Sequence, residues 1–299
     1  MLGRNRIRTS GFMLVALIVL GVSQTHADFA LFDNFDNYAA GLNLNGLGPV
    51  GNTWTTPDAT AAGTITIVNV APGNNAVQFK AAADNVAHRN FRSLQAAGLA
   101  IPNASSAATV FFTFRTGGGY LNFNNIVTDV AAPTNLAGDS EVQLNEDYSA
   151  GTFFRGRSAG SFLLLTTVAG PDQLARDAGR IIPVANATYN VWFAIDNSTD
   201  TYKIYMQSNA DPMAASVTQL LKATDGSGIF TFRNSGTALQ ANDLITFNMG
   251  IGGGGFVGPT FIDDIYVDTA AFNLANPVPE PAVLSTLAIG ALALLRRRR

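Results

Sequence analysis

Runs of β-branched and aromatic residues that alternate with polar ones fill the middle of this chain, and they constrain its fold more than any other feature. Clusters of Gly, Asn, Asp and Pro separate these runs, which lie at residues 64–70, 76–79, 110–115, 141–144, 161–165, 189–195, 202–206, 244–249 and 261–267. Alternation at period two is typical of strands with one buried face. Only residues 171–178 and 216–222 have a brief helical pattern. The sequence therefore predicts an all-β, antiparallel sandwich, with a hairpin turn within residues 195–202.

The stretch between two terminal signals is long enough for one domain. Residues 28–276 show no internal repeat and contain no cysteine. An all-β chain of this length commonly folds as a single unit, and its stability comes from core burial because it has no disulfides. Seven of the 18 Lys and Arg residues but only one of the 21 acidic residues lie outside this stretch, which leaves it near −9. No basic stripe remains that could neutralise phosphates, so nucleic acid is not an expected partner.

The N-terminal residues have the three-part pattern of a secretory signal peptide. Three arginines lie within the first eight residues, residues 12–22 are mostly apolar, and residues 25–27 read Thr-His-Ala. We predict a signal helix within residues 1–27, its removal by signal peptidase, and a mature chain that starts at Asp28. The alternative is an uncleaved signal anchor.

The C-terminal residues carry a second signal in three parts. In order, these are Pro279, Glu280 and Pro281, an apolar run at residues 282–295, and the cluster Arg296, Arg297, Arg298 and Arg299. The 14 residues of this run would form a helix of about 21 Å, shorter than the roughly 30 Å hydrocarbon core of a bilayer. The arginines act as a stop-transfer signal that keeps the C-terminus in the cytoplasm. We predict a short hydrophobic helix used in sorting; the alternative is a permanent transmembrane anchor.

This tail resembles the PEP-CTERM sorting signal of Gram-negative bacteria that make exopolysaccharide. The resemblance covers residues 277–299 and includes the order of the three parts. It implies export, a transient stay in the inner membrane, and recognition by a membrane-embedded exosortase that passes the protein to the cell surface or the biofilm matrix. The predicted organisation is a signal peptide at 1–27, a β-sandwich domain at 28–272, a linker at 273–278 and the sorting signal at 279–299.

Residues near both ends of the predicted domain resemble those of concanavalin-like and laminin-G-like jelly rolls. Residues 32–38 read Phe-Asp-Asn-Phe-Asp-Asn-Tyr and lead to Trp54, residues 187–206 place two aromatic runs around a polar turn, and the last run carries Asp263 and Asp264. The resemblance spans residues 28–272. It implies two antiparallel sheets whose first and last strands pair.

Four aspartates form the candidate metal site. The first predicted strand region supplies Asp33 and Asp36, and the last supplies Asp263 and Asp264. Pairing of the two strands would bring these carboxylates together, and carboxylates from adjacent segments are ligands that Ca²⁺ prefers. The hypothesis is a structural calcium ion that clamps the ends of the domain. The alternative is that these aspartates cap strand ends and turns.

No catalytic residue is predicted. His88 is the only histidine after the predicted signal peptide, no Gly-x-Ser-x-Gly elbow occurs, and without cysteine the usual zinc sites are excluded. Residues 141–146 resemble the Glu-x-Asp-x-x-Glu strand of family 16 glycoside hydrolases, in which two glutamates are the nucleophile and the acid/base. Those roles would fall on Glu141 and Glu146, but Gln143 replaces the central aspartate. A glycan hydrolase is therefore the rival hypothesis.

Two residues in a loop are the candidate ligand contacts. Tyr120 and Asn122 follow a triple glycine, whereas Trp192 lies between two apolar residues and is expected to be buried. The main hypothesis is a secreted, non-catalytic, lectin-like protein associated with extracellular polysaccharide. A third hypothesis is a structural matrix protein without a specific ligand.

Overall fold

Strands make up almost all of the regular structure. The computed structural model describes residues 28–56, 65–80, 88–116, 123–133, 142–146, 162–167, 170–173, 186–221, 226–232, 242–251 and 259–278. Within these residues the only helical element is the short 3-10 helix η1 (Pro212–Ala214). No helix of the described part is both long enough and apolar enough to span a bilayer.

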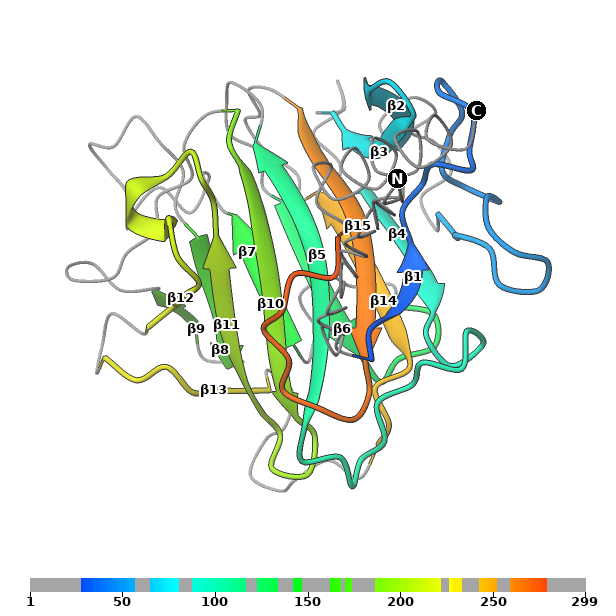
Figure 1. Cartoon of the computed structure of the whole chain (residues 1–299). Helices are drawn as coiled ribbons and strands as arrows, with labels where there is room; N and C mark the ends of the chain where they lie inside the picture. Colours follow the sequence, from blue (N-terminus) through cyan, green and yellow to red (C-terminus); the bar gives the residue numbers. More distant parts are fainter. Residues whose placement is uncertain are drawn as a thin grey trace, which may run out of the picture.

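Sheet A, which faces the viewer in Figure 1, is antiparallel and contains nine of the described strands. Its main path is β12 (Thr218–Gln219), β11 (Thr201–Gln207), β10 (Thr188–Asp196), β5 (Ala108–Thr116), β15 (Thr260–Asp268), β3 (Asn74–Phe79) and β2 (Ile65–Ala71). Off this path, β1 (Ala30–Asp33) pairs with β15, and β13 (Phe230–Thr231) pairs with β11. Sheet A carries the features that matter for the candidate site.

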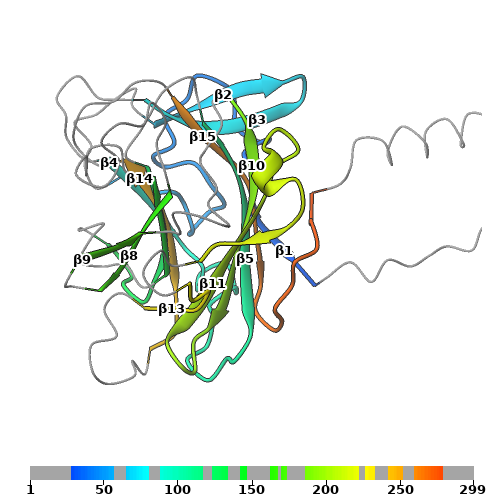
Figure 2. The ribbon, with the colours of Figure 1, turned by 90° about the vertical axis from the view of Figure 1, so that its left-hand side faces the viewer.

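Sheet B contains six of the described strands and is also antiparallel. Its order is β4 (His88–Ser93), β14 (Thr246–Ile251), β6 (Phe123–Thr128), β7 (Val142–Glu146), β8 (Phe162–Thr167) and β9 (Gly170–Gln173). Figure 2 shows the two sheets as two layers that pack face to face. The chain is a jelly-roll β-sandwich, which confirms the predicted fold class.

Two predicted pairings are confirmed. β10 and β11 form the expected hairpin, with Asp196 opposite Thr201 at its end. The Asp196 carboxylate accepts hydrogen bonds from the backbone N–H groups of Ser198 and Thr199, which is how an Asx turn closes a hairpin. The first and last strands also pair, with Ala30 opposite Val267.

The core forms where alternate residues of the two sheets meet. From β10 it receives Tyr189, Val191, Phe193 and Ile195, and from β14 it receives Phe247 and Met249. Phe112 of β5 packs edge-on against Phe193 in its own sheet and contacts Phe247 across the sandwich. Burial of each such aromatic ring contributes roughly 2–3 kcal/mol, so this core can stabilise the domain without disulfides.

A second apolar cluster lies on the outer face of sheet A, where a C-terminal strap covers it. The strap comprises residues 269–278, which turn back after β15 and cross β5 and β10 (Figure 1). The Thr109 hydroxyl donates to the Ala271 carbonyl at 2.8 Å, and the Trp192 indole N–H donates to the Ala275 carbonyl at 3.0 Å. Trp192 is fully buried, as predicted. Residues 273–278, the predicted linker, thus pack against the sandwich.

Some predicted elements differ in the structure or lie outside the described residues. The helical patterns are wrong where they can be checked, because residues 171–173 belong to β9 and residues 218–219 form β12. Packing against neighbouring strands overrides such a weak local preference. The predicted signal helix at residues 1–27 and the predicted C-terminal helix within residues 279–299 lie outside the described residues.

Candidate functional site

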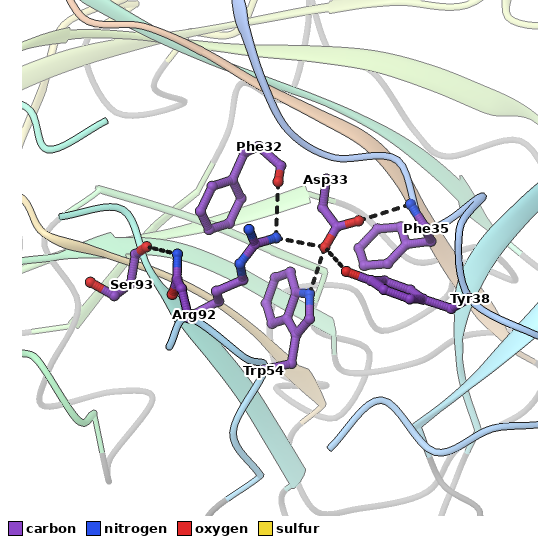
Figure 3. A network of polar contacts seen from close by, with 8 residues as sticks. Phe32, Asp33, Phe35, Tyr38, Trp54, Arg92 and Ser93 are labelled. Carbon is purple, nitrogen blue, oxygen red and sulfur yellow. Dashed lines mark hydrogen bonds and ion pairs between the residues drawn. The ribbon is translucent and has the colours of Figure 1, made fainter. Parts of the chain in front are cut away.

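Asp33, the first of the predicted calcium ligands, is held in a buried network between the two sheets (Figure 3). Its carboxylate forms an ion pair with Arg92 of β4 at 2.7 Å, and Arg92 also donates to the Phe32 carbonyl at 2.9 Å. Arg92 is 4 % exposed and Asp33 is 8 % exposed. The guanidinium also lies 4.4 Å from the centre of the Phe32 ring, a cation–π contact.

Three further donors saturate the Asp33 carboxylate. The Trp54 indole N–H donates to Oδ2 at 2.9 Å, the Tyr38 hydroxyl donates to the same oxygen at 2.8 Å, and the Phe35 backbone N–H donates to Oδ1 at 2.9 Å. Burial, followed by the charge of Asp33, raises the pKa of Tyr38, so its hydroxyl stays protonated as a donor. This carboxylate is structural, and it does not join the other three aspartates.

The remaining aspartates meet at an irregularity in β15. The register of β15 against β5 shifts between Asp263 and Tyr266, and Asp264 has a φ of 53°. A positive φ is unusual for Asp and is a feature of bulges that redirect side chains. The backbone N–H of Asp264 donates to Asp263 Oδ1 at 2.8 Å. Asp36 lies beside them, and its carboxylate accepts a hydrogen bond from the Asn75 backbone N–H.

These three carboxylates carry more negative charge than their surroundings neutralise. Burial, followed by the charges of Asp264 and Asp36, raises the pKa of Asp263 to about 9. Burial, followed by the charge of Asp36, raises the pKa of Asp264 to about 6. Burial and mutual repulsion thus favour the uptake of a proton by this pair of carboxyl groups.

The described part of the chain does not contain the cluster of oxygen ligands that the calcium hypothesis requires. There, no group of three or more His, Cys, Asp or Glu side chains is arranged to hold a metal ion. The structure brings Asp36, Asp263 and Asp264 near one another but binds Asp33 to Arg92. Calcium needs six to eight oxygen ligands, and these residues do not supply such a shell.

The acidic residues line a cavity of about 320 Å³ on the outer face of sheet A. Its polar and aromatic lining comes from four strands and the strap, and includes Asn74, Thr113, Arg115, Thr188, Asn190, Phe261, Asp263, Asp264 and Asn276. The Arg115 guanidinium lies 5.4 Å from the centre of the Phe261 ring. Arg115 Nε and Asn74 Oδ1 are buried atoms without a hydrogen-bond partner. Such atoms are uncommon in folded proteins, and a ligand or water in the cavity would satisfy them.

A second cavity of about 530 Å³ adjoins the first. Thr188, Asn190 and Asn276 line both, so we treat the two as one outer groove. The second cavity is rich in amides and carries no charged side chain; its further lining residues are Asn186, Ala187, Gln207, Ser208, Asn209 and Ala210. The outer groove therefore has an acidic and aromatic half and a neutral amide half.

The other candidate residues predicted from sequence fall mostly outside the described residues. These are Tyr120, Asn122, Glu141, Pro279, Glu280, Pro281 and the four arginines at 296–299. Glu146 ends β7, opposite Phe123 of β6 and Phe162 of β8. The groove residues Arg115, Asn190 and Asn276 were not predicted. Their one sequence signal is that Arg115 and Asn190 occupy the outward positions of alternating strands, a signal shared with many solvated residues.

No family model matches the sequence, and no curated protein matches it. Solved structures with a similar arrangement include winged bean acidic lectin with methyl-α-D-galactose (8% identity, 80% of this chain and 99% of that one, TM-score 0.42). Others are the glycoside hydrolase family 131 catalytic domain from Coprinopsis cinerea (9%, 83% and 96%, 0.45) and the calcium- and Man3GlcNAc-bound VIP36 lumenal domain (8%, 74% and 85%, 0.40). These similarities assign no binding site to this chain.

Proposed function

We propose that this protein binds extracellular polysaccharide in the outer groove and does not act on it chemically. The observation that carries the proposal is the groove itself. It consists of two adjoining cavities of about 320 Å³ and about 530 Å³, and the side-chain amide of Asn190 lines both. Side-chain amides both donate and accept, and therefore match the hydroxyl groups of sugars. Phe261, at the charged end, offers a ring against which an apolar sugar face can pack.

Export supports this role but rests on sequence alone. The signal peptide pattern at residues 1–27 and the PEP-CTERM-like tail at residues 279–299 support passage through the inner membrane and processing by signal peptidase and an exosortase. We propose that the protein then resides at the cell surface or in the extracellular matrix of a Gram-negative bacterium. A polysaccharide is the ligand class found there.

Replacing Asn190 with alanine should weaken polysaccharide binding about tenfold, because both halves of the groove lose a hydrogen-bonding group. The measurement is calorimetric titration of the full-length protein in detergent with soluble dextran, β-glucan and galactan. The matched control is Asn37→Ala, because Asn37 is exposed and lies outside the groove. The proposal fails if no polysaccharide binds, or if both variants bind as tightly as the unmodified protein.

A hydrolase is the second candidate, and one observation favours it. Asp263 and Asp264 are neighbouring carboxyl groups that line the groove, burial raises the pKa of both, and glycoside hydrolysis uses a pair of carboxyl groups. The same titration samples should therefore be assayed for released reducing sugar. Product that disappears in Asp263→Asn would replace the binding proposal with hydrolysis at this pair. Product that disappears only in Glu141→Gln or Glu146→Gln would place catalysis on the strand predicted from sequence.

A further inference from the structure

The two ends of the described sandwich meet on the outer face of sheet A. Phe29 packs edge-on against Phe111 of β5, with ring centroids 6.3 Å apart. Trp192 packs against the same Phe111 at 5.2 Å and donates its indole N–H to the Ala275 carbonyl of the strap. Three consecutive contacts thus connect residue 29 with residue 275. Figure 2 shows that the described chain begins and ends on this side of the sandwich.

Exposed apolar side chains lie on the two segments that form these ends. Leu31 of β1 is 49 % exposed, and Phe272 and Leu274 of the strap are 51 % and 36 % exposed. Leu31 pairs with Tyr266 of β15, whose ring packs against Phe111, so the Leu31 side chain lies on the outer face as well. Exposed apolar groups gathered on one face indicate an interaction surface.

The sequence on either side of the described sandwich indicates that this surface contacts a lipid bilayer. Residues 12–22 and 282–295 are apolar, and arginines lie at the outer side of each run. Segments of this kind enter or lie on a lipid bilayer. Only residues 279–281 separate the strap from the second apolar run, and three extended residues span at most about 11 Å. While this run is in a bilayer, the strap must therefore lie close to the lipid surface.

We propose that the outer face of sheet A is a membrane-facing surface before the chain is processed, on which Leu31, Phe272 and Leu274 contact the bilayer that holds the terminal segments. The acidic residues Asp263 and Asp264 do not oppose this contact, because they line a cavity rather than project from the face.

The test uses single cysteines, which are unique because the chain contains none. Full-length Phe272→Cys and Ile229→Cys proteins each receive an environment-sensitive fluorophore and are placed in phosphatidylcholine–phosphatidylglycerol vesicles with spin-labelled lipid. Ile229 is 50 % exposed, like Phe272, but precedes β13 on the side away from the chain ends (Figure 2). We expect lipid quenching at residue 272 to exceed that at residue 229 at least about twofold.

Equal quenching at the two positions, or stronger quenching at residue 229, would overturn the proposal. Leu31→Cys provides a second probe of the same face, because it lies in β1 rather than in the strap, and should behave like Phe272→Cys. The vesicle experiment contains no polysaccharide. Its failure would therefore leave the proposed binding function standing, and failure of the titration with dextran, β-glucan and galactan would leave the membrane-facing surface standing.

Discussion

Replacing Arg92 with methionine should lower the free energy of unfolding by about 3–5 kcal/mol, because it leaves the Asp33 carboxylate buried without its cation. Asp33 is 8 % exposed and lies 2.7 Å from the guanidinium. Arg92 of β4 in sheet B is also the residue that connects Asp33 of β1 to the opposite layer (Figure 3). A domain of this kind is stable by only about 5–15 kcal/mol. Urea unfolding, followed by tryptophan fluorescence, measures the change.

Two further variants isolate the ion pair as the cause. Asp33→Asn combined with Arg92→Met should lose less stability than Arg92→Met alone, because no buried charge is left without a partner. Lys203→Met, which removes a cation from the outer face of β11, should stay within about 0.5 kcal/mol of the unmodified protein. A loss below about 1 kcal/mol in Arg92→Met would contradict the structural role of this pair.

Replacing Asp263 with asparagine should raise the free energy of unfolding by about 2–4 kcal/mol at pH 8. Burial raises the pKa of Asp263 to about 9 in the folded protein, whereas an unfolded aspartate titrates near its ordinary value of 3.8. Between these values the folded state binds the extra proton, so the stability of the unmodified protein falls as pH rises. Asparagine does not titrate and removes that dependence.

The measurement is urea unfolding of both proteins from pH 4 to pH 9. The gain from Asp263→Asn should shrink to below about 1 kcal/mol at pH 4, because the unfolded aspartate also binds a proton near its ordinary pKa. Thr113→Val, a change in the same cavity that removes no charge, is the control. The same two proteins also test the calcium hypothesis. Added calcium that raises the melting temperature of the unmodified protein, but not of Asp263→Asn, would show that a cation rather than a proton neutralises these carboxylates.

The alternation of apolar and polar residues predicts a strand well where the next strand along the chain alternates in the same way. Residues 189–195 and 202–206 alternate cleanly and are joined by residues suited to a turn, so β10, β11 and their hairpin follow directly. The sequence does not predict β4, because Phe91 is the only apolar residue of its six, His-Arg-Asn-Phe-Arg-Ser. Arg92 occupies a core-facing position there, and only the ion pair with Asp33, 59 residues away, makes that position tolerable.

The candidate site could be predicted only in part. Pairing of the first and last strands indicated that Asp36 approaches Asp263 and Asp264, and the structure brings these residues together. The expected strand pairing could not indicate that Asp33 pairs with Arg92, because that contact depends on how the two sheets stack. The sequence could not predict the outer groove for a similar reason. Asn276 reaches the groove because the strap folds back over β10.

Binding in the outer groove is the central claim, and a reporter inside the groove tests it most directly. Thr188 is exposed and lines both cavities, so a fluorophore on Thr188→Cys samples the site that polysaccharide would occupy. We predict a saturable change in its fluorescence on titration with dextran, β-glucan or galactan, and no change from the same fluorophore on Ile229→Cys. Calorimetric binding without any response at residue 188, or with equal responses at both positions, would contradict the account.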